Sequence, residues 1–186
     1  MKNRWMWIVS VLILLLGVAV WILKQRGAGA GDVDLIDRFS NAEKRTLMAD
    51  KSAAFSVIDA TINGEIKRAI FTRPASRIIW RVTIPKDAWL RTSLALKPEA
   101  WAKPGDGVYF RIAVSDGRNY EELLAQQVNP GARPGDRRWI PVNLDLSAYA
   151  DQAVEVIFNT NTSPPKAGDD RRNDLALWGA PQIYVR

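Results

Sequence analysis

Aromatic side chains are the residues of this sequence best suited to hold a ligand, because their flat apolar faces can stack on a sugar ring. The chain has eight tryptophans and four tyrosines. Trp139 lies opposite the alternating apolar face that begins at Ile140, so we expect its indole to be exposed. Tyr109, Tyr120 and Trp101 are the next candidates for a ligand or partner surface. The alternative is that these rings pack inside the domain or against a partner protein.

Residues for catalysis are scarce. The sequence has no cysteine and no histidine, which excludes thiolate chemistry, Ser-His-Asp catalysis and histidine-ligated zinc or haem. Glu121 and Glu122 are adjacent, and neighbours on a strand point to opposite faces, whereas glycosidase carboxylates must converge on one bond. Gly105 and Gly107 lead into a strand rather than a helix, so they do not form a phosphate loop. We expect no enzymatic activity.

The formal net charge of +6 gives little support to nucleic-acid binding. Four of the basic residues flank an apolar segment near the N-terminus: Lys2, Arg4, Lys24 and Arg26. The remaining basic residues are scattered, whereas a nucleic-acid surface needs them clustered. We therefore expect no nucleic-acid partner.

The apolar segment runs from Trp5 to Leu23 without a charged residue. As a helix it would extend about 28 Å, close to the ~30 Å hydrocarbon thickness of a bilayer. Trp5 and Trp7 mark one end and Trp21 the other, where indoles favour the interface between lipid and water. Gly17 offers a small residue where another helix could approach. The sequence predicts a single transmembrane helix.

The alternative is a cleavable secretory signal, since Ala28-Gly29-Ala30 resembles a cleavage site. However, the apolar run is longer than the usual signal core, and Lys24 and Arg26 separate it from the small residues. We favour an uncleaved anchor with its N-terminus inside. This places a single-pass protein in the bacterial inner (cytoplasmic) membrane, with the lipid bilayer as a partner and the C-terminal domain in the periplasm.

The chain after the anchor divides further. Leu35, Ile36 and Phe39 recur at helical spacing, which predicts an amphipathic helix over Asp32–Leu47. The expected divisions are a basic N-terminus at 1–4, the transmembrane helix at 5–23, a Gly/Ala tether at 24–31, the amphipathic helix and a linker at 32–52, and a β-sandwich domain at 53–186.

From Phe55 the pattern changes to short alternating segments separated by Gly, Pro, Asn and Asp. Asn63-Gly64 is the strongest two-residue hairpin signal. The expected strands are Ser56–Ile62, Glu65–Phe71, Arg77–Ile84, Trp89–Leu96, Val108–Ser115, Tyr120–Val128, Arg138–Leu144, Val154–Phe158 and Gln182–Val185. Many strands and little helix predict a mainly β fold, a jelly-roll-like antiparallel β-sandwich.

Four stretches carry a resemblance to a known superfamily: Trp101–Gly117, Trp139–Tyr149, Val156–Thr160 and Asp174–Ile183. The phrase Asp145-Leu-Ser-Ala-Tyr149, followed by an apolar strand and then Trp178-Gly-Ala-Pro181, is similar to features that recur in galactose-binding-like jelly rolls of bacterial exported and membrane-attached proteins. The resemblance covers residues from roughly 85 to 186. It implies a fold and not a function, because this fold serves sugar binding, protein docking and plain structure alike.

The resemblance also implies one cofactor, because galactose-binding-like domains often hold a structural calcium ion with loop carboxylates. Hard oxygen ligands suit calcium. The candidate ligands are the loop aspartates Asp106, Asp116, Asp169, Asp170 and Asp174. The pairs Asp106-Gly107 and Asp116-Gly117 are also ordinary turn dipeptides. We expect no other cofactor.

Two functions are compatible with these features. The one that the sequence favours is a non-catalytic accessory or scaffolding subunit of a larger bacterial membrane complex, for example photosynthetic or respiratory. Its partners would be other membrane-protein subunits, and without histidine it could not supply the usual imidazole ligand to haem or chlorophyll. The alternative is a membrane-tethered carbohydrate-binding module at the cell envelope, with a glycan as its partner.

Overall fold

The computed structural model describes residues 31–162 and 171–186. The expected transmembrane helix, with Trp5, Trp7, Gly17 and Trp21, lies outside the described residues. Within them, no helix is both long enough and apolar enough to cross a membrane. The part described below is the unit from Asp32 to Arg186.

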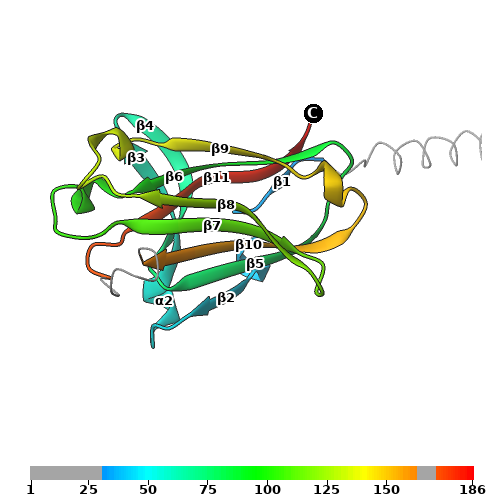
Figure 1. The fold of residues 1–186 in the computed structure, drawn as a ribbon, viewed down its shortest axis with the longest axis horizontal. Coiled ribbons are helices and arrows are strands. Elements are labelled where there is room, and N and C mark those ends of the chain that lie inside the picture. The colour runs from blue at the N-terminus through cyan, green and yellow to red at the C-terminus, as the bar shows by residue number, and fades with distance from the viewer. Residues whose placement is uncertain (1–30, 163–170) are drawn as a thin grey trace, which may run out of the picture. The chain divides into compact units, whose positions relative to one another are not determined.

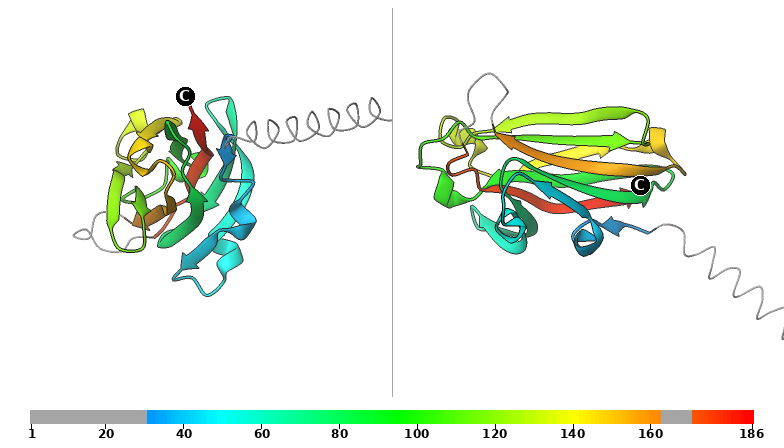
Figure 2. Two further views of the ribbon diagram at one scale, coloured as in Figure 1. Left: turned by 90° about the vertical axis from the view of Figure 1, so that its right-hand side faces the viewer. Right: turned by 90° about the horizontal axis from the view of Figure 1, so that it is seen from below.

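Two antiparallel sheets pack face to face (Figures 1 and 2). Sheet A has the strand order β3-β4-β11-β6-β9, with β1 also paired to β11, and sheet B has the order β2-β5-β10-β7-β8. The strands are β1 (Val33–Asp34), β2 (Glu43–Thr46), β3 (Phe55–Ile62), β4 (Glu65–Thr72), β5 (Ser76–Thr83), β6 (Ala88–Leu96), β7 (Val108–Ser115), β8 (Tyr120–Val128), β9 (Ile140–Asp145), β10 (Ala153–Thr162) and β11 (Ala176–Val185).

Helical structure among the described residues is limited to short connections. These are η1 (Phe39–Asn41), α2 (Lys51–Ala54), η2 (Pro98–Ala100), η3 (Pro134–Asp136) and η4 (Ser147–Tyr149). The side chain of Asp50 caps α2 by accepting a hydrogen bond from the backbone N–H of Ser52 at 2.8 Å. The predicted mainly β architecture is confirmed.

The core lies between the two sheets and follows the predicted alternation. In β5, Ile78, Trp80 and Val82 are buried against sheet A. Aromatic rings join the layers: Trp178 of β11 lies 4.8 Å from Phe110 of β7, centroid to centroid, and 4.4 Å from Phe158 of β10. The opposite face of each sheet points away from this core.

The Asn63-Gly64 hairpin is confirmed. Asn63 and Gly64 connect β3 to β4, and Ile62 pairs with Glu65 across the turn. Both turn residues have positive φ, at 49° and 82°, which is the backbone conformation that Asn and Gly adopt at low cost.

The amphipathic helix expected over Asp32–Leu47 is wrong. Asp34 Oδ1 accepts backbone hydrogen bonds from Ile36 (2.7 Å) and Asp37 (3.3 Å), which closes a local turn in place of a helical one. The apolar side chain of Leu35 is buried in the core, and its carbonyl accepts a hydrogen bond from Trp80 Nε1 at 3.0 Å. Since β1 pairs with β11 and β2 with β5, the sandwich begins at residue 33 and not at 53.

The last strand is longer than predicted. Only Gln182–Val185 was expected, whereas β11 begins at Ala176 and continues through a register shift between Gly179 and Gln182. Ala180 within this shift has φ of 43°. A β-bulge contains Gly and Pro residues as a turn does. The sequence therefore predicts a strand boundary near Gly179 and Pro181, although β11 continues through them.

Candidate functional site

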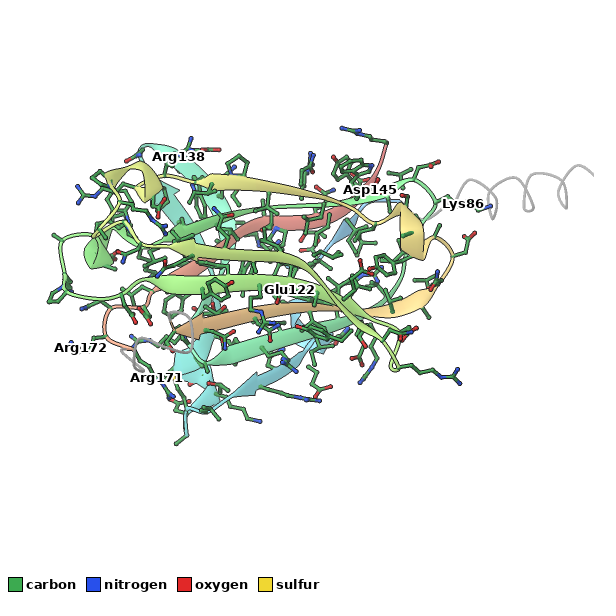
Figure 3. The ribbon with its side chains drawn as sticks, viewed as in Figure 1. Lys86, Glu122, Arg138, Asp145, Arg171 and Arg172 are labelled. Atoms are coloured by element: carbon green, nitrogen blue, oxygen red, sulfur yellow. The ribbon has the colours of Figure 1, made fainter. Side chains whose placement is uncertain are left out.

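The face of sheet B that points away from the core has a small apolar centre with polar residues around it. Ile79, Ile157 and Ala113 form the centre and are aligned across β5, β10 and β7. Residues two positions away along each strand share this face. Those that matter below are Arg77, Tyr109, Arg111, Tyr120, Asn159 and Asn161. We call it the sheet B outer face; Figure 3 labels Glu122 of β8, the edge strand of this sheet.

Two of the four aromatic candidates lie on this face. Tyr109 in β7 pairs with Asn161 of β10 and is half-buried. Tyr120 begins β8, and 46% of its surface is exposed. Tyr120 therefore offers an aromatic ring to solvent from a surface otherwise rich in hydrogen-bonding groups.

A row of hydrogen bonds crosses the sheet B outer face. Arg77 Nε donates to Asn159 Oδ1 at 2.6 Å, and Asn159 Nδ2 donates to the Tyr120 hydroxyl at 3.3 Å. Asn159 is only 4% exposed. Because both atoms of its amide are engaged, Asn159 fixes the positions of Arg77 and Tyr120 relative to each other.

A shallow hollow of about 300 Å³ opens next to Arg77. We call it the Arg77 hollow. Its lining is Arg45, Thr46, Leu47, Ala75, Ser76, Arg77, Asn159 and Asn161. The buried atoms Ser76 Oγ and Asn161 Oδ1 have no hydrogen-bond partner among the described residues. Only Asn161 shares the face of Arg77, because Ser76 is adjacent to Arg77 in β5 and its side chain points toward the core.

A second hollow, of about 420 Å³, lies further along the same strands and is lined in part by Arg81, Ser115 and Glu155. Arg81 Nε is 3.0 Å from Glu155 Oε1, and Arg81 Nη2 is 3.4 Å from Glu43 Oε2. The two hollows are separated by about four residues of β5 and β10, or roughly 13 Å. The intervening surface is long enough for a chain of more than one sugar residue.

Trp139, the aromatic residue predicted to be most exposed, is buried, with 7% of its surface exposed. Its side chain does point away from the main core, as the alternation predicted, but the outside of sheet A has its own apolar cluster with Ala69, Ala95 and Leu177. These small residues leave room for the indole, whose Nε1 donates to the Glu65 carbonyl at 3.2 Å. The expectation of exposure is wrong.

Trp101 follows η2 and is partly buried against both the main core and the cluster that contains Trp139; its Nε1 donates to the Leu96 carbonyl at 2.9 Å. The four aromatic candidates therefore do not form one surface, because only Tyr109 and Tyr120 lie on the sheet B outer face.

The five aspartates suggested for calcium do not come together as one group. Asp106 precedes β7 and Asp116 follows it, so the two lie at opposite ends of an eight-residue strand. Asp169 and Asp170 lie outside the described residues. Within residues 31–162 and 171–186 no group of three or more acidic side chains is placed to hold a metal ion. Calcium binding remains a prediction.

Asp116 instead has a structural role in the turn between β7 and β8. Its carboxylate accepts hydrogen bonds from the backbone N–H groups of Asn119 (2.6 Å) and Arg118 (2.8 Å), and from the Asn119 side chain at 2.9 Å. These bonds favour the charged form and lower the pKa of Asp116 to about 2.

The residues that sequence reasoning missed are Arg77, Asn159 and Asn161. A signal for them exists, because each alternates with a buried residue of its own strand: Arg77 precedes Ile78, and Asn159 and Asn161 flank the buried Thr160. What the pattern does not contain is the pairing of β5 with β10, which brings Arg77 opposite Asn159.

Comparison with known proteins identifies the fold. No protein-family model matches the sequence. An uncharacterised protein of Archaeoglobus fulgidus is 35% identical over 130 residues, which cover 66% of this chain and 32% of that protein. The matched region thus spans about a third of the relative's length.

Several solved structures share the architecture. A family 51 carbohydrate-binding module from Clostridium perfringens, in complex with methyl-galactose, superimposes with a TM-score of 0.53 at 14% identity over 82% of this chain and 99% of its own. A xylan-binding family 22 module from Paenibacillus barcinonensis gives 0.51 at 10% identity over 83% and 98%. A family 61 module with β-1,4-galactotriose gives 0.50 at 15% identity over 80% and 90%. The fold is the galactose-binding-like jelly roll expected from the sequence.

Proposed function

We propose that the domain from Asp32 to Arg186, with its galactose-binding-like fold, is a non-catalytic carbohydrate-binding module whose ligand lies on the sheet B outer face. The observation that carries the proposal is the row Arg77–Asn159–Tyr120 beside the Arg77 hollow. It combines an exposed aromatic ring with fixed polar groups, as a site for a sugar requires.

The similar structures support the same class of ligand. Their descriptions name methyl-galactose, β-1,4-galactotriose and xylan as what those modules bind or contain. The shared fold alone does not carry their ligands over to this chain, so the choice of surface rests on the residues of sheet B.

The anchor and the location of the module are separate proposals that rest on the sequence. A membrane-spanning helix at Trp5–Leu23 would hold the module at the membrane surface, facing the periplasm. Neither the fold nor the similar structures bear on the accessory-subunit function that the sequence favoured, which stays a prediction. The carbohydrate-binding alternative has the better support.

The test measures binding of the full chain, purified in mild detergent, to a panel of neutral and acidic polysaccharides by affinity gel electrophoresis. Tyr120→Ala should weaken retention about tenfold or more, equivalent to about 1.4 kcal/mol, because the stacking ring is lost. Tyr184→Ala is the matched control, since Tyr184 is a partly buried tyrosine at the outside of sheet A. Retention that survives Tyr120→Ala, or no retention of the unmodified chain on any glycan, would contradict the proposal.

A further inference from the structure

Among the described residues, the arginines of the sheet B outer face contact carboxylates, with Arg77 as the exception. Arg45 contacts Glu43 at 2.6 Å, Arg81 contacts Glu155 at 3.0 Å, and Arg111 contacts Glu122. Arg77 forms no ion pair with any described residue, and its contact is the neutral amide of Asn159. Three arginines on this face thus have their charge balanced by a carboxylate from the protein, and Arg77 does not.

The position of Arg77 makes this charge available to a ligand. Its Nε is bonded to Asn159 Oδ1, which holds the guanidinium in place and leaves the two Nη groups as donors. Arg77 lines the Arg77 hollow and is half-buried, so water screens its charge less than that of an exposed arginine.

The Arg77 hollow has a positive lining. Its lining includes Arg45, whose charge is balanced by Glu43, and Arg77, whose charge is not, and among the described residues no acidic side chain lines it. Arg171 and Arg172 lie toward one end of the sandwich, away from Lys86 and Asp145 (Figure 3). The hollow is therefore better suited to an anion than to a neutral group, because a carboxylate accepts two parallel hydrogen bonds from a guanidinium.

We infer that the sugar bound in the Arg77 hollow carries a carboxylate, as in a uronic acid residue, and that Arg77 binds this carboxylate. The inference rests on the proposed function and names its ligand class. The carboxylate pairs with the Arg77 guanidinium, and the sugar ring lies beside Asn161, which shares this face and lines the same hollow. The Tyr120 ring marks where the glycan continues across the sheet.

The experiment compares two probes that differ at one carbon. One is methyl galactoside, and the other is the methyl glycoside of galacturonic acid, in which C6 is a carboxylate. Binding of each to the full chain in mild detergent is measured by titration calorimetry, with galactan and polygalacturonate as the polymeric pair. The acidic probe should bind at least about tenfold more tightly, and its affinity should fall as salt is raised. Arg77→Gln should remove this preference, because it should weaken binding of the acidic probe much more than binding of the neutral probe.

Two variants act as controls. Arg77→Lys keeps the charge but cannot form the paired hydrogen bonds, so it should give an intermediate affinity and also covers the case in which Arg77→Gln does not fold. Arg91→Gln removes a comparable contact at the outside of sheet A, where Arg91 Nη2 donates to Gln182 Oε1 at 2.7 Å, and should have no effect.

The outcomes separate the two proposals. Equal binding of the neutral and acidic probes, lost in Tyr120→Ala, would overturn the carboxylate inference and leave the carbohydrate-binding function standing. A preference for the acidic probe that Arg77→Gln does not alter would likewise overturn the role of Arg77. Absence of binding to every glycan would overturn both.

Discussion

The indole of Trp139 lies directly against Gly179: a Cβ added to Gly179 would be 2.7 Å from Trp139 Cζ3. Gly179 sits in β11, next to Ala69 of β4. The missing side chain allows the indole to cover Leu177 and close the outside of sheet A. The absence of a side chain at Gly179 thus allows Trp139 to pack on the outside of sheet A.

Gly179→Ala is therefore expected to lower the free energy of unfolding by about 1–3 kcal/mol, because the added methyl group overpacks the contact with Trp139. Its carbon would also lie 3.0 Å from Lys67 Cδ, a flexible atom that can move. Denaturant titration of the variant measures the effect. Gly135→Ala is the matched control, since a Cβ there meets no atom within 4 Å. Equal stability of the two variants would show that the indole can shift freely.

Thr160→Val is expected to cost about 1–3 kcal/mol although it preserves volume, because it removes the hydrogen-bond partner of two buried groups, the Trp178 indole N–H and the Thr72 hydroxyl. Thr160 Oγ1 accepts a hydrogen bond from Trp178 Nε1 at 3.1 Å and lies 2.9 Å from Thr72 Oγ1. Thermal unfolding measures the loss. Thr160→Ser keeps the hydroxyl and should be the milder change; a serine variant as unstable as the valine variant would assign the effect to packing.

Asp116 should make stability depend on acid pH. Its folded pKa, about 2, is below the model-peptide value of 3.8, so the charged form is the one that the fold favours. The stabilising contribution is present above about pH 4 and is lost as the pH falls toward 2. Unfolding of the wild type and Asp116→Asn should be compared from pH 7 downward. The difference between them should shrink through this window; a constant difference would contradict the assignment.

The strands were predictable where one face is buried and the other is not. Val108–Ser115 was placed correctly because Val108, Phe110, Ile112 and Val114 alternate with more polar residues. The prediction failed at Asp32–Leu47, where the apolar residues have helical spacing but the segment forms two short strands, β1 and β2, that pair with distant strands. Contacts with β11 and β5 override the local pattern there, and such contacts between distant segments are not visible in the sequence.

The candidate site was only half predictable. Tyr120 and Tyr109 were named from residue type, but Trp139 was assigned to the solvent because the pattern shows on which side a ring lies and not what covers it. Gly179, which makes room for that ring, is 40 positions away in the chain. Arg77 required knowledge of its neighbours, because three other arginines on the same face differ from it only in having a carboxylate partner.

The pairing of β1 with β11 has a mechanical consequence. The two strands run in opposite directions, so the chain enters the domain at Asp32 beside the point where β11 ends at Val185. Asp32 accepts hydrogen bonds from Gln182 Nε2 at 2.9 Å and from the Val185 N–H at 3.4 Å. A force that pulls the two ends of the domain apart would break the hydrogen bonds of Asp32 and of the β1–β11 pair one after another rather than all at once. The two-residue β1 would detach from β11 first, and the load would then pass to β2, the edge strand of sheet B.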